Sequence, residues 1–157
     1  MNKIGVMLGD LGASQLSFNV VTKLNKECEK SNNDFVAFVE NITNHIIPPS
    51  FAIMGVNEIW SFDGTLVATS ASTALHLSKA TNPANKFFYV WDLEWMRPNG
   101  KDFQYMVRAY NNPYVKLIAR SPEHALAIKN YCNRGVCGIV EDFNMEQLYE
   151  VTNNVSN

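Results

Sequence analysis

Residues 87–96 read FFYVWDLEWM, and this stretch decides the fold class. Its first half is a continuous apolar run, which is typical of a strand buried on both faces of a parallel sheet. Its second half places two carboxylates, Asp92 and Glu94, between two tryptophans. In open α/β sheets, ligands bind where parallel strands end. We therefore expect a central strand over residues 86–92 that leads directly into a candidate site.

Strands and helices alternate on both sides of this stretch. An apolar strand at residues 3–8 is followed by a glycine-bearing turn and a helix at residues 14–30, whose apolar residues recur every four positions. A second strand follows at residues 34–40. This β-turn-α-β opening builds parallel sheets with right-handed crossovers. The alternation predicts one α/β domain over residues 1–157, a Rossmann-like three-layer αβα architecture with a mostly parallel, doubly wound sheet.

The remaining elements follow from apolar runs and helix-capping residues. Ser70 or Ser72 caps a helix that ends near Lys79, and Ser121 begins the clearest helix, because proline and an acidic residue follow it. The other predicted elements are a helical turn at 50–54, strands at 58–62, 65–69, 114–119 and 136–140, a helix at 101–110 and a helix from Asn144 to about Val151.

The amino-acid composition argues against a nucleic-acid partner and against a membrane span. The chain has 157 residues, 46% of them hydrophobic and 18% charged, which suffices for one domain with a sizeable core. The net charge is −2 and the 13 basic residues are scattered, so we expect no nucleic-acid partner. No apolar run reaches the ~18 residues that a membrane-spanning helix needs. We therefore expect no membrane span.

Cysteine and histidine patterns give no metal centre. Cys28, Cys132 and Cys137 are odd in number and lack CxxC spacing, which favours free thiols in a reducing, cytoplasmic setting. No HxH or HExxH pattern occurs, which argues against zinc hydrolysis. No metal and no cofactor is therefore predicted.

The turn after the first strand contains Gly9, Asp10 and Gly12. A strand-glycine-helix turn directs backbone N–H groups and a helix dipole towards an anion or a sugar nucleotide. The spacing is neither the dinucleotide fingerprint G-x-G-x-x-G nor a P-loop, because the required third glycine and the lysine are missing. Turn geometry alone explains these glycines equally well, so both readings stay open.

The carboxylates Asp92 and Glu94 are the candidate catalytic residues. Two residues apart, they would share one face of a continuing strand. The pair is suited to act as a general base, to ligate a metal or to accept hydrogen bonds from sugar hydroxyls. Trp95 is a candidate ligand-binding aromatic beside them. The alternative is two solvated carboxylates at the exit of a strand.

Two other segments resemble functional motifs. Residues 62–66 echo the D-x-D-G-T-L loop of haloacid-dehalogenase phosphatases, but Ser61 stands where the nucleophilic aspartate belongs, so Asp63 and Gly64 are interpreted as a turn. Ser121 is a candidate ligand-binding residue at the end of a strand. His124, one turn later, either faces the same cleft or serves at the helix terminus.

The order of elements resembles the N-terminal Rossmann-like half of GT-B glycosyltransferases. The segments that carry the resemblance are residues 3–12, 66–74, 89–96, 117–131 and 138–148. They match the opening strand and glycine turn, the strand with a Ser-initiated helix, the acidic-aromatic strand end, the strand that leads through Ser into a helix, and the closing strand and short helix. The likeness is one of order and spacing.

The resemblance implies an acceptor-side half of a glycosyltransferase, with a cleft lined by Gly9, Asp10, Gly12, Ser70 and Ser121 beside the two carboxylates. Asp92 or Glu94 would then deprotonate an acceptor hydroxyl. In that family a C-terminal domain holds the nucleotide-sugar donor, and we expect no such domain within these 157 residues. A separate chain or a second copy would complete the cleft. The alternative is a non-catalytic Rossmann-like binding domain that self-associates; a flavodoxin-like or response-regulator-like domain fits less well.

Overall fold

A computed structural model describes residues 3–30, 34–42, 44–81, 85–97 and 102–155. Its strands are β1 (Ile4–Leu8), β2 (Phe35–Val39), β3 (Ala52–Gly55), β4 (Thr65–Ala68), β5 (Lys86–Tyr89), β6 (Lys116–Ala119) and β7 (Gly138–Ile139). Its α-helices are α1 (Gln15–Lys30), α2 (Ala71–His76), α3 (Phe103–Asn111), α4 (Pro122–Cys132) and α5 (Met145–Asn154). Short 3₁₀ helices are η1 (Val56–Ser61), η2 (Leu77–Lys79), η3 (Glu94–Met96) and η4 (Glu141–Phe143).

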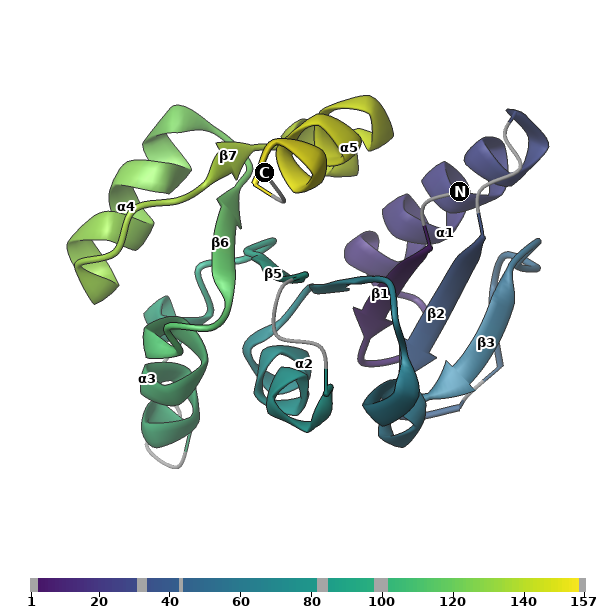
Figure 1. The fold of residues 1–157 in the computed structure, drawn as a ribbon, viewed down its shortest axis with the longest axis horizontal. Coiled ribbons are helices and arrows are strands. Elements are labelled where there is room, and N and C mark those ends of the chain that lie inside the picture. The colour runs from purple at the N-terminus through teal and green to yellow at the C-terminus, as the bar shows by residue number, and fades with distance from the viewer. Residues whose placement is uncertain (1–2, 31–33, 43, 82–84, 98–101, 156–157) are drawn as a thin grey trace.

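The strands form one seven-stranded sheet in the order β3-β2-β1-β4-β5-β6-β7. All of its pairings are parallel. The chain starts at β1, extends the sheet through β2 to β3, and then returns to β4 and extends it in the opposite direction to β7 (Figure 1). The predicted α/β class and Rossmann-like, doubly wound sheet are confirmed. The point where the direction reverses lies between β1 and β4, and ligands of such sheets bind there.

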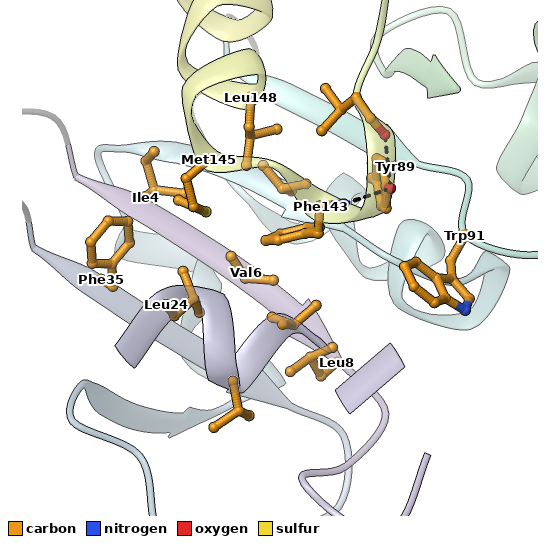
Figure 2. Close-up of a cluster of buried hydrophobic side chains, with 14 of the residues drawn as sticks. Ile4, Val6, Leu8, Leu24, Phe35, Tyr89, Trp91, Phe143, Met145 and Leu148 are labelled. Atoms are coloured by element: carbon orange, nitrogen blue, oxygen red, sulfur yellow. Dashed lines mark hydrogen bonds between the residues drawn. The ribbon is translucent and has the colours of Figure 1, made fainter. Parts of the chain in front are cut away.

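Helices cover both faces of the sheet, and each face has its own core. On one face, α1 and α5 pack against alternate strand residues in the first core (Figure 2), whose members include Leu24, Phe35, Tyr89, Phe143 and Leu148. On the other face, α2, α3 and α4 enclose the second core with Phe38, Leu66, Phe88, Tyr110 and Ile128. The central strands are buried throughout, as the apolar run at residues 87–91 predicts.

Four helix starts agree with the capping residues in the sequence. Ser14 accepts a hydrogen bond from the N–H of Ser17, and Ser121 accepts one from the N–H of His124. Ser70 caps α2 in a reciprocal capping box, and Asn144 caps α5. Each of these side chains satisfies an N–H group that the first helical turn leaves unpaired. The residues next to each helix start therefore determine where the helix begins, and with it where the preceding strand ends.

The segment between β2 and β4 differs from the prediction. The expected helical turn at residues 50–54 is wrong, because β3 lies there and pairs with β2. The expected strand at residues 58–62 is also wrong, because η1 occupies Val56–Ser61 and buries Val56 and Ile59. Three residues make one 3₁₀ turn, so Val56 and Ile59 lie on the same side. As an edge strand, β3 is only partly buried, with Ala52 and Met54 exposed.

The strand at the start of the candidate site is shorter than predicted. β5 ends at Tyr89, and the chain then enters η3 at Glu94. Asp92 and Glu94 therefore do not share the face of a strand. The predicted helix at residues 101–110 is α3, which begins at Phe103; residue 101 lies outside the described residues.

Candidate functional site

The carboxyl ends of the strands place several predicted residues along one edge of the sheet. Gly9 follows β1, Ser70 follows β4, Asp92 lies beyond β5 and Ser121 follows β6. Because all strands are parallel, these positions lie at the same edge. The edge includes the reversal point between β1 and β4, where a ligand is expected.

Two carboxylates meet the first turn of α2 at the reversal point. Glu94 Oε1 accepts a hydrogen bond of 2.8 Å from the N–H of Ala71, and Glu40 Oε1 accepts one from the hydroxyl of the next residue, Ser72. Glu40 Oε1 also lies 3.2 Å from Nε2 of His76, one turn further along α2. This reversal point is the topological switch point of the sheet. We therefore use the name switch-point cluster for Glu40, Ser72, His76, Asp92 and Glu94. Its members come from segments after β2, β4 and β5.

Glu94 is a partly buried carboxylate of this cluster. Burial raises its pKa above the ordinary value of 4.5, and the neighbouring charges of Asp92 and Glu40 raise it further, although the hydrogen bond from Ala71 acts in the opposite direction. A carboxylate with a raised pKa is a stronger base than a solvated one. Of the two predicted catalytic residues, Glu94 has the environment suited to proton transfer.

Asp92 is more accessible. Its carboxylate lies 3.0 Å from a guanidinium nitrogen of Arg97, and both side chains are well exposed. An ion pair this exposed is screened by solvent and contributes ~0–1 kcal/mol to stability. Asp92 is therefore free to exchange its partner for a ligand at small cost.

Glu40, Ser72 and His76 were not among the residues predicted from the sequence. Glu40 directly follows β2, the neighbour of β1, and its carboxylate would lie 3.8 Å from a Cβ placed on Gly9. A search for polar residues directly after each buried strand would have found Glu40. Its contact with α2 depends on the strand order, which the sequence pattern does not specify.

The turn after β1 satisfies its own backbone groups. Asp10 Oδ1 accepts a 2.8 Å hydrogen bond from the N–H of Gly12, and the carbonyl of Asp10 accepts one from the Ser17 hydroxyl. No described glycine has a positive φ, so neither Gly9 nor Gly12 is required by backbone conformation. The Gly12 N–H that was considered for an anion is thus already paired within the turn.

Trp95 is directed away from the switch-point cluster. Its ring stacks on Tyr131 at 4.2 Å between centroids and meets Tyr110 edge-on at 5.0 Å. These contacts make Trp95 part of the wall of the second core. The cause is η3, which replaces the extended strand at this point and so changes the direction of alternate side chains.

Ser121 and His124 lie at the start of α4, beyond β6. Ser121 caps the helix, and Nδ1 of His124 faces the N–H of Arg120 at 3.5 Å. Burial and the charge of Arg120 lower the pKa of His124. The Arg120 guanidinium stacks on Trp91, 3.9 Å from the ring centroid, and donates to Asp142. These residues follow β6, the neighbour of β5, and the charge of Asp92 acts on His124 in the opposite direction to that of Arg120. The hydrogen bond of the Ser121 side chain lies within the start of α4.

The structure adds two observations about classes of site. In the described ranges, no group of three or more His, Cys, Asp or Glu side chains is arranged to hold a metal ion. Among the helices of those ranges, none is both long and apolar enough to cross a membrane.

The raised pKa of Glu94 predicts a specific dependence of stability on pH. A group whose pKa is higher in the folded state favours folding below its unfolded pKa, and this contribution is lost as pH rises through the folded pKa. The Glu94→Gln variant keeps an oxygen for the Ala71 N–H but cannot ionise. We expect it to equal the wild type below pH 4.5 and to become relatively more stable as pH rises. Urea unfolding over a pH series measures the difference.

Glu123→Gln is the control with the opposite sign. Hydrogen bonds from its own backbone N–H and from Ser121 lower the pKa of Glu123. The stability it contributes is present above its unfolded pKa and lost as pH falls, so the variant should be the less stable protein at neutral pH and should match the wild type in acid. If the Glu94→Gln difference is constant with pH, the carboxylate is not desolvated in solution.

The comparisons with known proteins place no further constraint on this site. No model of a known protein family matches the chain, and no curated protein sequence is significantly similar to it. The chemistry of the switch-point cluster is therefore the basis for assigning a function.

Proposed function

We propose that the switch-point cluster binds a neutral, hydroxyl-rich molecule, and that the chain is the acceptor side of a glycosyltransferase-like enzyme. The observation that carries this proposal is the convergence of Glu40 and Glu94 on consecutive residues of α2, with Asp92 beside them. Carboxylates accept hydrogen bonds from hydroxyl groups, and several accepting oxygens in one place suit a sugar.

The charge of the cluster supports a neutral ligand over a phosphorylated one. Three carboxylates lie together, Arg97 is paired with Asp92, and His76 with Glu40. A phosphate would be repelled by these carboxylates. The N–H of Ala71, which a phosphate would otherwise use, is already bonded to Glu94. A nucleotide-sugar donor would therefore be held by a separate chain or a second copy, and this chain would contribute the acceptor.

Glu94 is the proposed general base. It would accept the proton of an acceptor hydroxyl as that oxygen attacks the anomeric carbon of the donor, and the nucleotide would leave with the bonding electrons. Its raised pKa brings it closer to the operating pH, where general bases are most effective. Asp92 and Glu40 would hold neighbouring hydroxyls. The three cysteines are free thiols, which supports the proposed cytoplasmic location.

Backbone NMR of the labelled chain tests the binding step. Titration with glucose, galactose and N-acetylglucosamine should shift the amide signals of Ala71, Ser72 and Gly9 in a saturable manner. The Glu94→Gln variant should bind more weakly, whereas Glu123→Gln, which lies on α4, should bind as the wild type does. No saturable shift with any sugar, or shifts at a different edge of the sheet, would reject the proposal.

A turnover assay addresses the enzymatic part. Hydrolysis of UDP-, GDP- and ADP-sugars, and transfer to any sugar that binds, would be measured for the wild type and for the Asp92→Asn, Glu94→Gln double variant. Turnover that persists without both carboxylates would exclude them as catalytic residues.

The second candidate function is a non-catalytic binding domain that self-associates. The pairing of the Gly12 and Ala71 N–H groups with Asp10 and Glu94 favours it, because these are the amides a donor phosphate would use. This candidate predicts sugar binding without turnover of any nucleotide sugar. It also predicts dimers or larger species, and light scattering measures these directly.

A further inference from the structure

A cavity of about 350 Å³ opens beside the start of α1, outside the switch-point cluster. Its walls are mainly apolar and come from the turn after β1, from α1 and from the segment after β2; the apolar lining residues are Leu11, Ala13, Phe18, Val21, Ile46 and Ile47. The described residues that line it include no ionisable side chain. A charged ligand would lose its hydration here without gaining an ionic partner.

The size and rim of the cavity fit a ring system. A dry cavity of about 150 Å³ is enough to hold benzene, and ligand pockets begin at about 300 Å³. Phe18 and Ile46 form part of the wall although they are 59% and 61% exposed. When an apolar group covers large apolar side chains that are this exposed, the free energy of the system falls. The hydroxyls of Ser14 and Ser17 and the N–H of Ser17 already form hydrogen bonds at the start of α1. A ligand in the cavity therefore does not need polar groups to satisfy them.

We propose that this cavity binds the neutral apolar part of a small molecule, an aromatic ring or fused ring pair. The turn at residues 9–12 connects it to the switch-point cluster, because Gly9 lies beside Glu40 whereas Gly12 lines the cavity. A ligand with a sugar on one side of this turn and an apolar ring on the other would use both sites. That joint use rests on the proposed function, but binding of the ring rests on the cavity alone.

Fluorescence of N-phenyl-1-naphthylamine, a neutral probe that brightens on leaving water, tests the cavity directly. The wild type should bind it saturably. Ile46→Asp, which adds a charge to the rim, should weaken binding by about tenfold or more, because the apolar contact of one large side chain is lost and a charge takes its place. Leu126→Asp is the matched control: Leu126 is 60% exposed but lies on α4, away from the cavity, and this variant should bind as the wild type does.

A second variant protects the test from a folding artefact. Ala13→Trp fills the cavity without adding charge, and Ala13 is exposed in the turn before α1. It should also reduce probe binding, with an unchanged circular dichroism spectrum. The proposal is overturned if no saturable binding occurs, or if both cavity variants bind the probe as tightly as the wild type.

Probe binding in the cavity can be distinguished from sugar binding at the switch-point cluster. Glu94→Gln should bind the probe normally, because Glu94 does not line the cavity. If a sugar binds in the NMR titration, its phenyl glycoside should bind about tenfold more tightly than its methyl glycoside, and Ile46→Asp should remove this preference. Probe binding without any sugar binding would support the cavity and reject the acceptor role.

Discussion

Replacement of Tyr89 by Phe is expected to destabilise the folded protein by about 2–4 kcal/mol, because it leaves two buried polar groups unpaired. Tyr89 is fully buried. Its hydroxyl donates a 2.9 Å hydrogen bond to the carbonyl of Val140 and accepts a 3.0 Å bond from the N–H of Phe143 (Figure 2). These bonds attach β5 to the segment that follows β7.

The attached segment makes this loss larger than for an ordinary hydrogen bond. Asp142 and Phe143 have φ values of 44° and 57°, in the left-handed region that non-glycine residues rarely adopt. Such a conformation persists only when its surroundings hold it, at ~1–3 kcal/mol per residue. Without the hydroxyl, we expect the segment around η4 to open first. Faster amide hydrogen exchange at Phe143, measured together with urea unfolding, would report this opening.

Tyr110→Phe is the control for the Tyr89 prediction. Tyr110 is also fully buried, but its hydroxyl has no hydrogen-bond partner within the described part of the chain. Removing an unpaired buried hydroxyl should be neutral or stabilising. The two variants delete the same atom from the same residue type at equal burial. Equal losses of stability in both would show that the two hydrogen bonds of Tyr89 contribute nothing.

Gly64→Ala is expected to cost about 3 kcal/mol or more, at the upper end of what overpacking does. A Cβ on Gly64 would clash with the carbonyl oxygen of Lys3 and would lie 2.7 Å from the ring of Phe62. The Lys3 oxygen cannot move away freely, because it accepts the 2.9 Å hydrogen bond from the N–H of Thr65 that joins the beginnings of β1 and β4. The substitution would therefore separate two central strands at their amino ends.

Gly55→Ala is the matched control. Gly55 is the last residue of β3, and nothing is within 4 Å of its Cβ position. Its φ and ψ of −69° and 146° suit alanine. A substitution that only reduces the conformational entropy of the unfolded chain should be neutral or should stabilise the folded protein by ~0.4–1 kcal/mol. Thermal and urea unfolding of both variants would reject the steric explanation if Gly64→Ala behaved like Gly55→Ala.

The fold was predictable from the sequence wherever local chemistry specifies it. The apolar run at residues 87–91, the cap at Ser70 and the Ser121-Pro122 helix start each satisfy a requirement within a few residues of the chain. The predicted secondary structure of residues 50–62 is wrong because an edge strand and a 3₁₀ helix have weak periodic patterns in their sequences. In that segment the pairing of β3 with β2 decides the structure, and this contact is not local.

The candidate site was predictable only in part for the same reason. Glu94 could be identified from its position after a buried strand. Its raised pKa depends on burial and on charges brought by other segments, among them Glu40. The contact of Glu40 with His76 requires the strand order to bring the end of β2 towards α2. Single-sequence reasoning therefore locates the edge of the sheet that carries the site, whereas the fold selects the residues that meet there.

The division of the interior into two cores has a consequence for synthesis of the chain on the ribosome. Buried members of the second core extend only as far as Ile128, so that side of the sheet can assemble while later residues are still being made. The first core joins Ile4 and Val6, at the beginning, to Phe143 and Leu148, near the end. Until those late residues emerge, the apolar side chains of β1 and α1 lack their partners. We expect the nascent chain to mature one face at a time, with the α1 face exposed to chaperones for longest.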